Sequence, residues 1–340
     1  MRRTLTIGVE ALFARADDRE GRRLMRRAPT RAARSARYRR AEERLWASVG
    51  VAPSEHWLHL GRNDVTVRVQ EVGAGPPVLF LHGGMNSGAL WADLAARLEG
   101  FRCLLLDRPG CGLSEATGLP LDAIALPRMA DALVVDVLDA LELETAHLVA
   151  TSLGGYVALR TAVAHPDRVG RMVQFSWPVG APHARLPVFM RAMGWMPGLE
   201  RIAGVLSPGE RAVRAMFGRL GLRRSLQEGR IPQELVDCYV ALLRDTDTLR
   251  NELPATRTLM SSRGGIDQRL LLTDAALAGV GAPTLLLWGE NDPFGDAEVA
   301  RGLVAHMPSA ELEVLAGASH APWLDDPVHV AARTAAFLHG

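Results

Sequence analysis

The chain contains no lysine, so all 39 of its lysine or arginine positions are arginines. This absence excludes catalysis through a lysine Schiff base or a Ser-x-x-Lys motif. Only three cysteines are present, Cys103, Cys111 and Cys238, too few and too scattered for a disulfide framework or a metal cluster. We therefore expect a protein of a reducing compartment with no bound metal ion.

Long hydrophobic runs are also missing, since no apolar stretch approaches the length needed to span a bilayer. The first fourteen residues resemble a short export signal with the paired arginines Arg2 and Arg3, but Glu10 interrupts their apolar part. The sequence thus predicts a cytoplasmic protein without a membrane span.

Arginine is in excess near the start of the chain. Residues 1–50 hold 14 arginines against six acidic residues, although the formal net charge of the whole chain is only +1. We interpret this segment as a solvated helical extension that packs on the body of the protein, with contact to an anionic surface or partner as the alternative. Its inner face would comprise Leu24, Met25, Tyr38, Leu45 and Trp46. No nucleic-acid partner is expected, and a homodimer is left open.

Short apolar runs alternate with helical patterns over most of the remaining chain. Residues 57–60 and 65–72 have the alternation of a β-hairpin around a turn at 61–64. Further strands are predicted at 78–81, 103–106, 147–149, 172–175, 284–288 and 312–315. Helices are predicted at about 90–99, 128–141, 153–164, 296–306 and 327–338. This alternation indicates an α/β fold whose mostly parallel sheet is covered by helices on both faces.

The alternation stops between about residues 177 and 282, a stretch with several prolines and helical patterns. It indicates a helical cap inserted between two strands, over the carboxyl ends where parallel sheets bind ligands. The predicted organisation is an extension at 1–50, a core at 51–176 and 283–340, and a cap at 177–282. Apolar side chains in the first half of the cap form either ordinary core or the lining of an apolar substrate pocket. They are Phe189, Met190, Met193, Trp195, Met196, Met216 and Phe217.

Residues 150–155, Ala-Thr-Ser-Leu-Gly-Gly, join a predicted strand directly to a predicted helix. A serine at the apex of so tight a turn is typical of a nucleophile elbow, which exposes the hydroxyl beside the first amides of the helix. Gly154 and Gly155 give the backbone room after the serine, while Ala150 replaces the first glycine of the usual motif. A helix N-cap is the alternative role for Ser152.

A serine nucleophile needs a base, and the base needs an orienting acid. The strand at 284–288 leads into a turn that ends at Asp292, with Glu290 and Asp296 as competing carboxylates. The last strand is followed by His320 in a loop of small residues, a position that no other histidine shares. We therefore predict a catalytic triad of Ser152, His320 and Asp292.

Acyl transfer also needs backbone donors for the developing oxyanion. One predicted donor is the amide of Leu153, which follows the nucleophile. The other lies in the loop His82-Gly83-Gly84-Met85, where glycines let the backbone come close. We assign it to Gly84, with Met85 as the alternative. Met85 and Trp323 are also candidates for the substrate pocket.

With these residues in place, the chain resembles the α/β-hydrolase superfamily over residues 56–340. The matching motifs are His82-Gly83-Gly84, Asp107-Arg108-Pro109-Gly110-Cys111-Gly112-Leu113-Ser114, Ser152-Leu153-Gly154-Gly155, His165-Pro166-Asp167-Arg168-Val169, Gly289-x-x-Asp292 and His320. The resemblance implies a mostly parallel eight-stranded sheet, a helical cap over the site and the Ser152, His320 and Asp292 triad. Relatives that are epoxide hydrolases or dehalogenases have aspartate at the nucleophile position, so Ser152 argues against both.

The sequence therefore predicts a serine hydrolase that needs no cofactor and cleaves an ester-like bond of an apolar small molecule through an acyl-enzyme. Hydrolysis of an amide, or of a C–C bond in a diketone-type substrate, is an alternative in the same class. Acyl transfer, cyclase or lyase chemistry in the same pocket, and a non-catalytic binding protein on this scaffold, are further alternatives.

Overall fold

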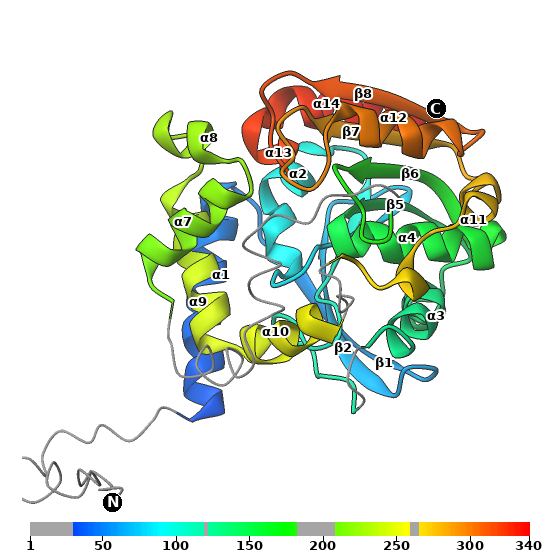
Figure 1. Ribbon diagram of the computed structural model, residues 1–340. Coiled ribbons are helices and arrows are strands. Elements are labelled where there is room, and N and C mark those ends of the chain that lie inside the picture. The colour runs from blue at the N-terminus through cyan, green and yellow to red at the C-terminus, as the bar shows by residue number, and fades with distance from the viewer. Residues whose placement is uncertain (1–29, 119–121, 182–207, 259–264) are drawn as a thin grey trace, which may run out of the picture.

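The computed structural model describes residues 30–118, 122–181, 208–258 and 265–340, which contain one eight-stranded sheet flanked by helices (Figure 1). The sheet order is β1-β2-β4-β3-β5-β6-β7-β8. The strands are β1 (Ser54–Leu60), β2 (Val65–Val72), β3 (Pro77–Leu81), β4 (Arg102–Leu106), β5 (Ala146–Thr151), β6 (Val169–Phe175), β7 (Thr284–Gly289) and β8 (Ala310–Leu315). The predicted α/β fold class and its eight-stranded sheet are confirmed.

Strand β2 is antiparallel to both of its neighbours, β1 and β4. All pairs in the rest of the sheet, from β4 through β3 to β8, are parallel. The predicted hairpin is confirmed, because β1 pairs with β2 from Ser54↔Glu71 to Leu60↔Val65. The parallel strands all end at one edge of the sheet, so the loops that follow β3, β5, β6, β7 and β8 come together there.

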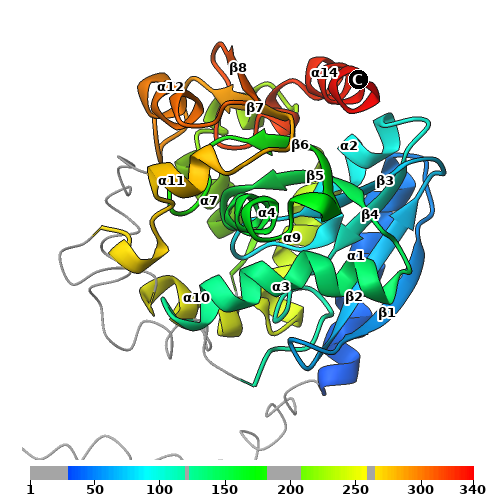
Figure 2. The ribbon, with the colours of Figure 1, turned by 90° about the vertical axis from the view of Figure 1, so that its right-hand side faces the viewer.

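The two faces of the sheet each bury an apolar cluster. Along β3, Leu79 and Leu81 point to one face, while Val78 and Phe80 point to the other, because side chains alternate along a strand. Four helices cover the first face, α3 (Ala125–Ala140), α4 (Ser152–Ala164), α11 (Asp274–Ala278) and α12 (Ala297–Ala305). The second face is covered by α2 (Ala92–Arg97), α14 (Pro327–His339) and the N-terminal helix α1 (Figure 2).

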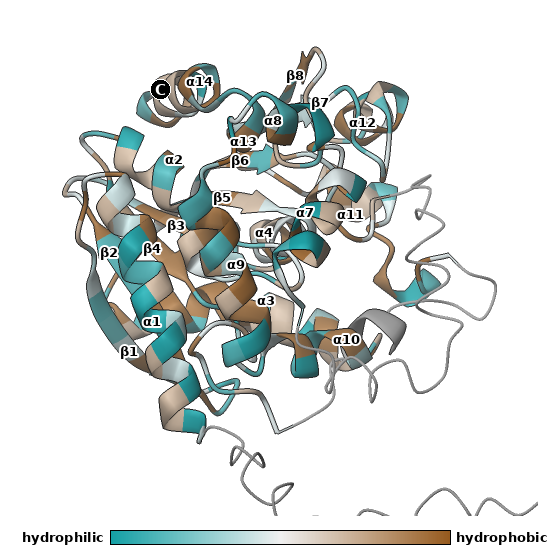
Figure 3. Ribbon diagram, turned by 90° about the vertical axis from the view of Figure 1, so that its left-hand side faces the viewer, coloured by the Kyte–Doolittle hydropathy of each residue, from teal (hydrophilic) through white to brown (hydrophobic). Residues whose placement is uncertain are grey.

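The N-terminal helix α1 (Arg31–Ser48) begins after Thr30, whose hydroxyl accepts from the Ala33 amide. Its inner face buries Tyr38, Leu45 and Trp46, as predicted, and hydrophilic residues lie on its outer side (Figure 3). Leu24 and Met25, the other predicted members of this face, lie outside the described residues. In the described ranges, no helix is both long and apolar enough to cross a lipid bilayer.

The described residues between β6 and β7 are mostly helical. Helices α7 (Glu210–Arg219), α8 (Arg223–Gln227), α9 (Gln233–Asp245) and α10 (Thr248–Thr258) precede α11, which packs on α4. Helix α9 lies beside α1 (Figure 1). Five of the apolar residues predicted for the cap lie outside the described residues: Phe189, Met190, Met193, Trp195 and Met196.

Candidate active site

Ser152 stands at the junction of β5 and α4 with a backbone φ of +52°, a conformation that L-residues rarely adopt. Both glycines after it are closely packed, the first against backbone atoms and the second against a side chain. A Cβ on Gly154 would lie 2.0 Å from the Leu81 carbonyl oxygen, and one on Gly155 would lie 2.3 Å from the Gln174 side chain. The local geometry is therefore that of a tight strand-to-helix turn with a serine at its apex.

His320 and Asp292 are brought together from the loops that follow β8 and β7. The His320 Nδ1 atom lies 2.9 and 3.0 Å from the two carboxylate oxygens of Asp292. The same oxygens accept from the backbone amides of Trp177 and Phe294, so the carboxylate is held in place from three directions. This arrangement orients the ring and leaves its Nε2 atom for exchange with a nucleophile.

The competing carboxylates lie elsewhere. Glu290 accepts from the Gly317 amide, and Asp296 caps the first turn of α12. Of these three acids, only Asp292 is hydrogen-bonded to His320 in the described part of the chain.

We expect Asp292→Asn to lower kcat by about 10⁴-fold, because an amide cannot hold the ring in the tautomer that accepts the serine proton. Glu290→Gln serves as the matched control and is expected to change kcat by less than about twofold, since its carboxylate only tethers a loop amide. Steady-state kinetics of the two variants on one substrate tests this. A larger loss in Glu290→Gln would contradict the assignment of the acid.

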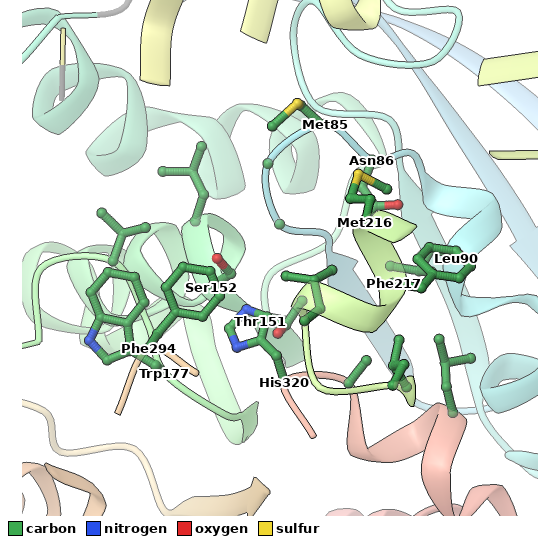
Figure 4. A pocket seen from close by; sticks show the side chains of 18 of the residues that line it. Met85, Asn86, Leu90, Thr151, Ser152, Trp177, Met216, Phe217, Phe294 and His320 are labelled. Atoms are coloured by element: carbon green, nitrogen blue, oxygen red, sulfur yellow. The ribbon is translucent and has the colours of Figure 1, made fainter. Parts of the chain in front are cut away.

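Ser152 and His320 line one pocket at the carboxyl ends of the strands (Figure 4). The ring centroid of Phe294 lies 4.5 Å from that of His320, and the Phe294 ring stacks on Trp177 with a centroid distance of 5.3 Å. Four predicted residues also line this pocket: Gly84, Met85, Leu153 and Trp323. Met216 and Phe217 reach it from α7, whereas Phe189, Met193 and Trp195 lie outside the described residues.

Sequence reasoning missed several lining residues. Trp177 lies two residues after the end of β6, and Phe294 lies two residues after Asp292 in the loop that follows β7. Their positions at strand ends would have indicated that they line the pocket. Tyr239 and Glu252 come from α9 and α10, where nothing in the local pattern distinguishes them from other helix residues. Among the described lining residues, Glu252 is the one Asp, Glu or Arg side chain.

The loop after β3 passes close to Ser152. A Cβ on Gly83 would lie 3.0 Å from the Ser152 Cβ, so any other residue would have to displace Ser152 slightly. In this loop the Met85 amide already donates to Glu252 Oε2 at 2.9 Å, which leaves Gly84 as the better candidate for an oxyanion donor.

His82, the first residue of this loop, is fully buried, and its imidazole ring makes the hydrogen bonds of the neutral form. Its Nδ1 lies 2.8 Å from the Gly83 carbonyl oxygen, and its Nε2 accepts from the Arg108 amide at 3.0 Å. Burial, and then the nearby Arg108 guanidinium, hold the pKa of His82 well below its ordinary value, against the effect of the Gly83 hydrogen bond.

This pKa shift predicts lower stability in mild acid. As the pH falls below the unfolded pKa of about 6.5, the unfolded state binds a proton at residue 82 and the folded state does not. The free energy of unfolding should therefore decrease by up to about 1.4 kcal/mol per pH unit until the folded pKa is reached. Denaturant unfolding at pH 7 and pH 5 tests this. The decrease in the free energy of unfolding between the two pH values should be smaller in His82→Gln than in the wild type, and unchanged in the control His59→Gln, whose histidine is exposed. An unchanged decrease in His82→Gln would contradict the prediction.

A comparison with known families bears on the whole site. The family model described as "alpha/beta hydrolase fold" matches residues 76–327, a span that contains Ser152, Asp292 and His320. The chain belongs to the α/β-hydrolase fold family. The resemblance predicted from the motifs is confirmed.

Among characterised proteins, this α/β hydrolase is similar to two groups of dienoate hydrolases. It is 26% identical over 270 residues to a 2-hydroxy-6-oxononadienedioate/2-hydroxy-6-oxononatrienedioate hydrolase of Cupriavidus pinatubonensis, covering 77% of this chain and 87% of the relative. It is 26% identical over 277 residues to a 2-hydroxy-6-oxo-6-phenylhexa-2,4-dienoate hydrolase of Burkholderia cepacia, covering 77% and 88%.

Solved structures show the same fold at lower identity. Naproxen esterase from Bacillus subtilis is 20% identical, with a TM-score of 0.70 and coverage of 91% of this chain and 99% of that one. The 2-hydroxy-6-oxo-6-phenylhexa-2,4-dienoate hydrolase of Rhodococcus is 19% identical, with a TM-score of 0.67 and coverage of 85% and 100%.

Proposed function

We propose that this α/β hydrolase cleaves a C–C bond next to a carbonyl group, with Ser152, His320 and Asp292 as its catalytic residues. The observation that carries the proposal is the Asp292–His320 pair beside Ser152 in one pocket. The relatives supply the bond type. A 2-hydroxy-6-oxo-dienoate contains no ester or amide, so a hydrolase named for it breaks a bond from carbon to carbon.

In the first half-reaction, Ser152 Oγ attacks the carbonyl carbon and its proton passes to His320 Nε2. The amides of Gly84 and Leu153 donate to the oxygen that becomes negative. The carbonyl then re-forms as the neighbouring C–C bond breaks. The departing carbon keeps the electron pair and takes the proton from His320, which leaves an acyl group on Ser152.

In the second half-reaction, His320 removes a proton from water, and the resulting hydroxide attacks the acyl carbon. Collapse of this intermediate expels Ser152, which regains its proton from His320 and releases a carboxylic acid. No metal or redox group takes part in either half-reaction. The helices α7–α10, which supply Met216, Phe217, Tyr239 and Glu252 to the pocket, would act as the cap.

Hydrolysis of an uncharged ester is the second candidate, and the lining of the pocket favours it. The described lining is mostly apolar. It contains one acidic side chain, that of Glu252, and no arginine. Every 2-hydroxy-6-oxo-dienoate carries at least one carboxylate, which it would place in this lining, and a buried charge is costly without an opposite charge. In ester hydrolysis the same steps apply, except that oxygen leaves in place of carbon.

A matched pair of substrates tests the proposal. One is a 2-hydroxy-6-oxo-dienoate with an apolar group on the 6-carbonyl, and the other is a p-nitrophenyl ester of the same acyl group. We expect turnover of the dienoate to exceed that of the ester and to disappear in Ser152→Ala. Turnover of the ester alone would replace the proposal by the second candidate. Turnover of neither across a panel of acyl lengths would overturn both.

A further inference from the structure

We propose that Glu252, on α10, is a positioning residue that fixes the Gly84 N–H as an oxyanion donor. The inference rests on the proposed function, because it assigns Gly84 a role only if Ser152 attacks a carbonyl or an analogous centre. Glu252 is 4% exposed and belongs to a segment more than 150 residues away from Gly84 along the chain. Its carboxylate oxygen Oε2 nevertheless lies next to Gly84, at 3.4 Å from the position of a Cβ there.

The first connection runs through Arg108. This guanidinium is fully buried and donates to the carbonyl oxygens of His82 and Gly83, both at 2.9 Å. The Gly83 carbonyl and the Gly84 N–H belong to one planar trans peptide, so they point in opposite directions. Arg108 therefore sets the direction of the Gly84 N–H together with the His82 ring, whose Nδ1 lies 2.8 Å from the same Gly83 oxygen. Glu252 Oε2 in turn accepts from Arg108 Nη2 at 3.1 Å, from the same nitrogen that holds Gly83.

The second connection runs through Met85. Its amide, in the peptide after Gly84, donates to Glu252 Oε2 at 2.9 Å. Its carbonyl oxygen accepts from the Tyr239 hydroxyl of α9, also at 2.9 Å. Met85 has a φ of +53°, and a non-glycine residue keeps such a conformation only when its surroundings hold it there.

One carboxylate oxygen thus holds the peptides on both sides of Gly84. The peptide before Gly84 is fixed through Arg108, and the peptide after it is fixed directly. A donor contributes to catalysis only when it already points at the position of the oxyanion, and misplacement by about 1 Å can cost about 10²-fold in rate. Glu252 acts through these peptides and not through contact with the reacting atoms.

The test uses a fluorophosphonate, because this probe needs no knowledge of the substrate. Its phosphorus is attacked by a serine nucleophile, fluoride leaves, and the phosphoryl oxygen occupies the oxyanion site. The maximal labelling rate then reports the oxyanion donors, and the half-saturating probe concentration reports binding. We expect Glu252→Ala to lower the maximal rate at least about tenfold, toward the 10²–10³-fold loss of a deleted donor. Glu252→Gln, which keeps an acceptor oxygen, should lose less, and half-saturation should stay within about twofold in both.

Asp136 supplies a matched control. Its buried carboxylate on α3 also accepts from an arginine, Arg62, and from a backbone amide, that of Asn63, but it does not line the pocket. Asp136→Ala is expected to lower thermal stability while its maximal labelling rate stays within about twofold of wild type. Tyr239→Phe removes only the hydroxyl that holds Met85. It tests the positioning of this loop even if Glu252→Ala does not fold. It should lower the maximal rate and not the affinity for the probe.

An unchanged maximal rate in folded Glu252→Ala would overturn the role of Glu252, while the proposed function would stand. If Glu252→Ala does not fold, unchanged maximal rates in both Glu252→Gln and Tyr239→Phe would have the same meaning. Equal losses in Asp136→Ala and Glu252→Ala would also overturn it, because general destabilisation would then explain both. Absence of labelling at Ser152 in the wild-type protein would overturn the proposed function itself, and this inference with it.

Discussion

Ser152→Ala is expected to lower kcat by about 10⁶-fold and to abolish covalent labelling by a fluorophosphonate. The variant keeps the pocket and the Asp292–His320 pair but lacks the oxygen that attacks. Folding should be intact, because alanine is smaller than serine and the positive φ at this position is imposed by the neighbouring β5 and α4. Steady-state kinetics, labelling and thermal unfolding of the purified variant measure these three effects.

Ser176→Ala is the matched control for this experiment. Ser176 has the same φ of +52° as Ser152 and also follows a strand of the sheet, but it is buried and its hydroxyl donates to the Ser319 carbonyl oxygen. We expect its labelling rate to stay within a few-fold of wild type, at a cost of about 1 kcal/mol in stability for the lost hydrogen bond. Equal labelling of wild type and Ser152→Ala would show that another residue is the nucleophile.

Removal of residues 1–50 is expected to prevent stable folding, which is the largest expected effect on stability. The reason is a buried ion cluster beneath α1. Arg68 on β2 is fully buried, and its guanidinium pairs with Glu42 of α1 and with Asp107 after β4, each at 2.7 Å. Although burial alone would lower the pKa of Arg68, Asp107 and Glu42 hold it well above its ordinary value. Without α1, this charge loses one of its two buried partners, Glu42, and the side chains of α1 that shield it.

The same cluster can be tested by one substitution in the full chain. Glu42→Gln removes one charge of a buried pair, a change that typically costs about 3–5 kcal/mol. Glu43→Gln changes the neighbouring exposed carboxylate and should stay within about 0.5 kcal/mol of wild type. Denaturant midpoints of the two variants measure the difference. Equal midpoints would show that the Glu42 charge does not stabilise the fold, and a truncated chain that folds with wild-type stability would show that α1 is dispensable.

The elements of the sheet could be predicted because each carries its own local signal. Strands such as β3 and β7 are short apolar runs that are buried on both faces, and each is bounded by turn residues. Ser152, Asp292 and His320 could be proposed because each follows one of these strands, and parallel topology gathers strand ends at one edge. The inner face of α1 could be predicted from the spacing of its large apolar residues.

The buried polar groups could not be predicted in the same way. Arg68 occupies an ordinary alternating strand and Glu252 an ordinary helix, so each looks like a solvated residue when only its neighbours in sequence are considered. Their partners, Glu42 and Arg108, lie 26 and 144 residues away. Such pairs depend on how distant elements pack, and no local pattern of apolar and polar residues encodes that packing.

The central claim is that Ser152 is the nucleophile, and peptide mapping of the labelled wild-type protein tests it most directly. Mass spectrometry after fluorophosphonate treatment should find a single phosphonyl adduct on the peptide that contains Ser152, formed at a rate that falls when His320 is replaced by alanine. An adduct on a different serine, or a rate that does not depend on His320, would contradict the account.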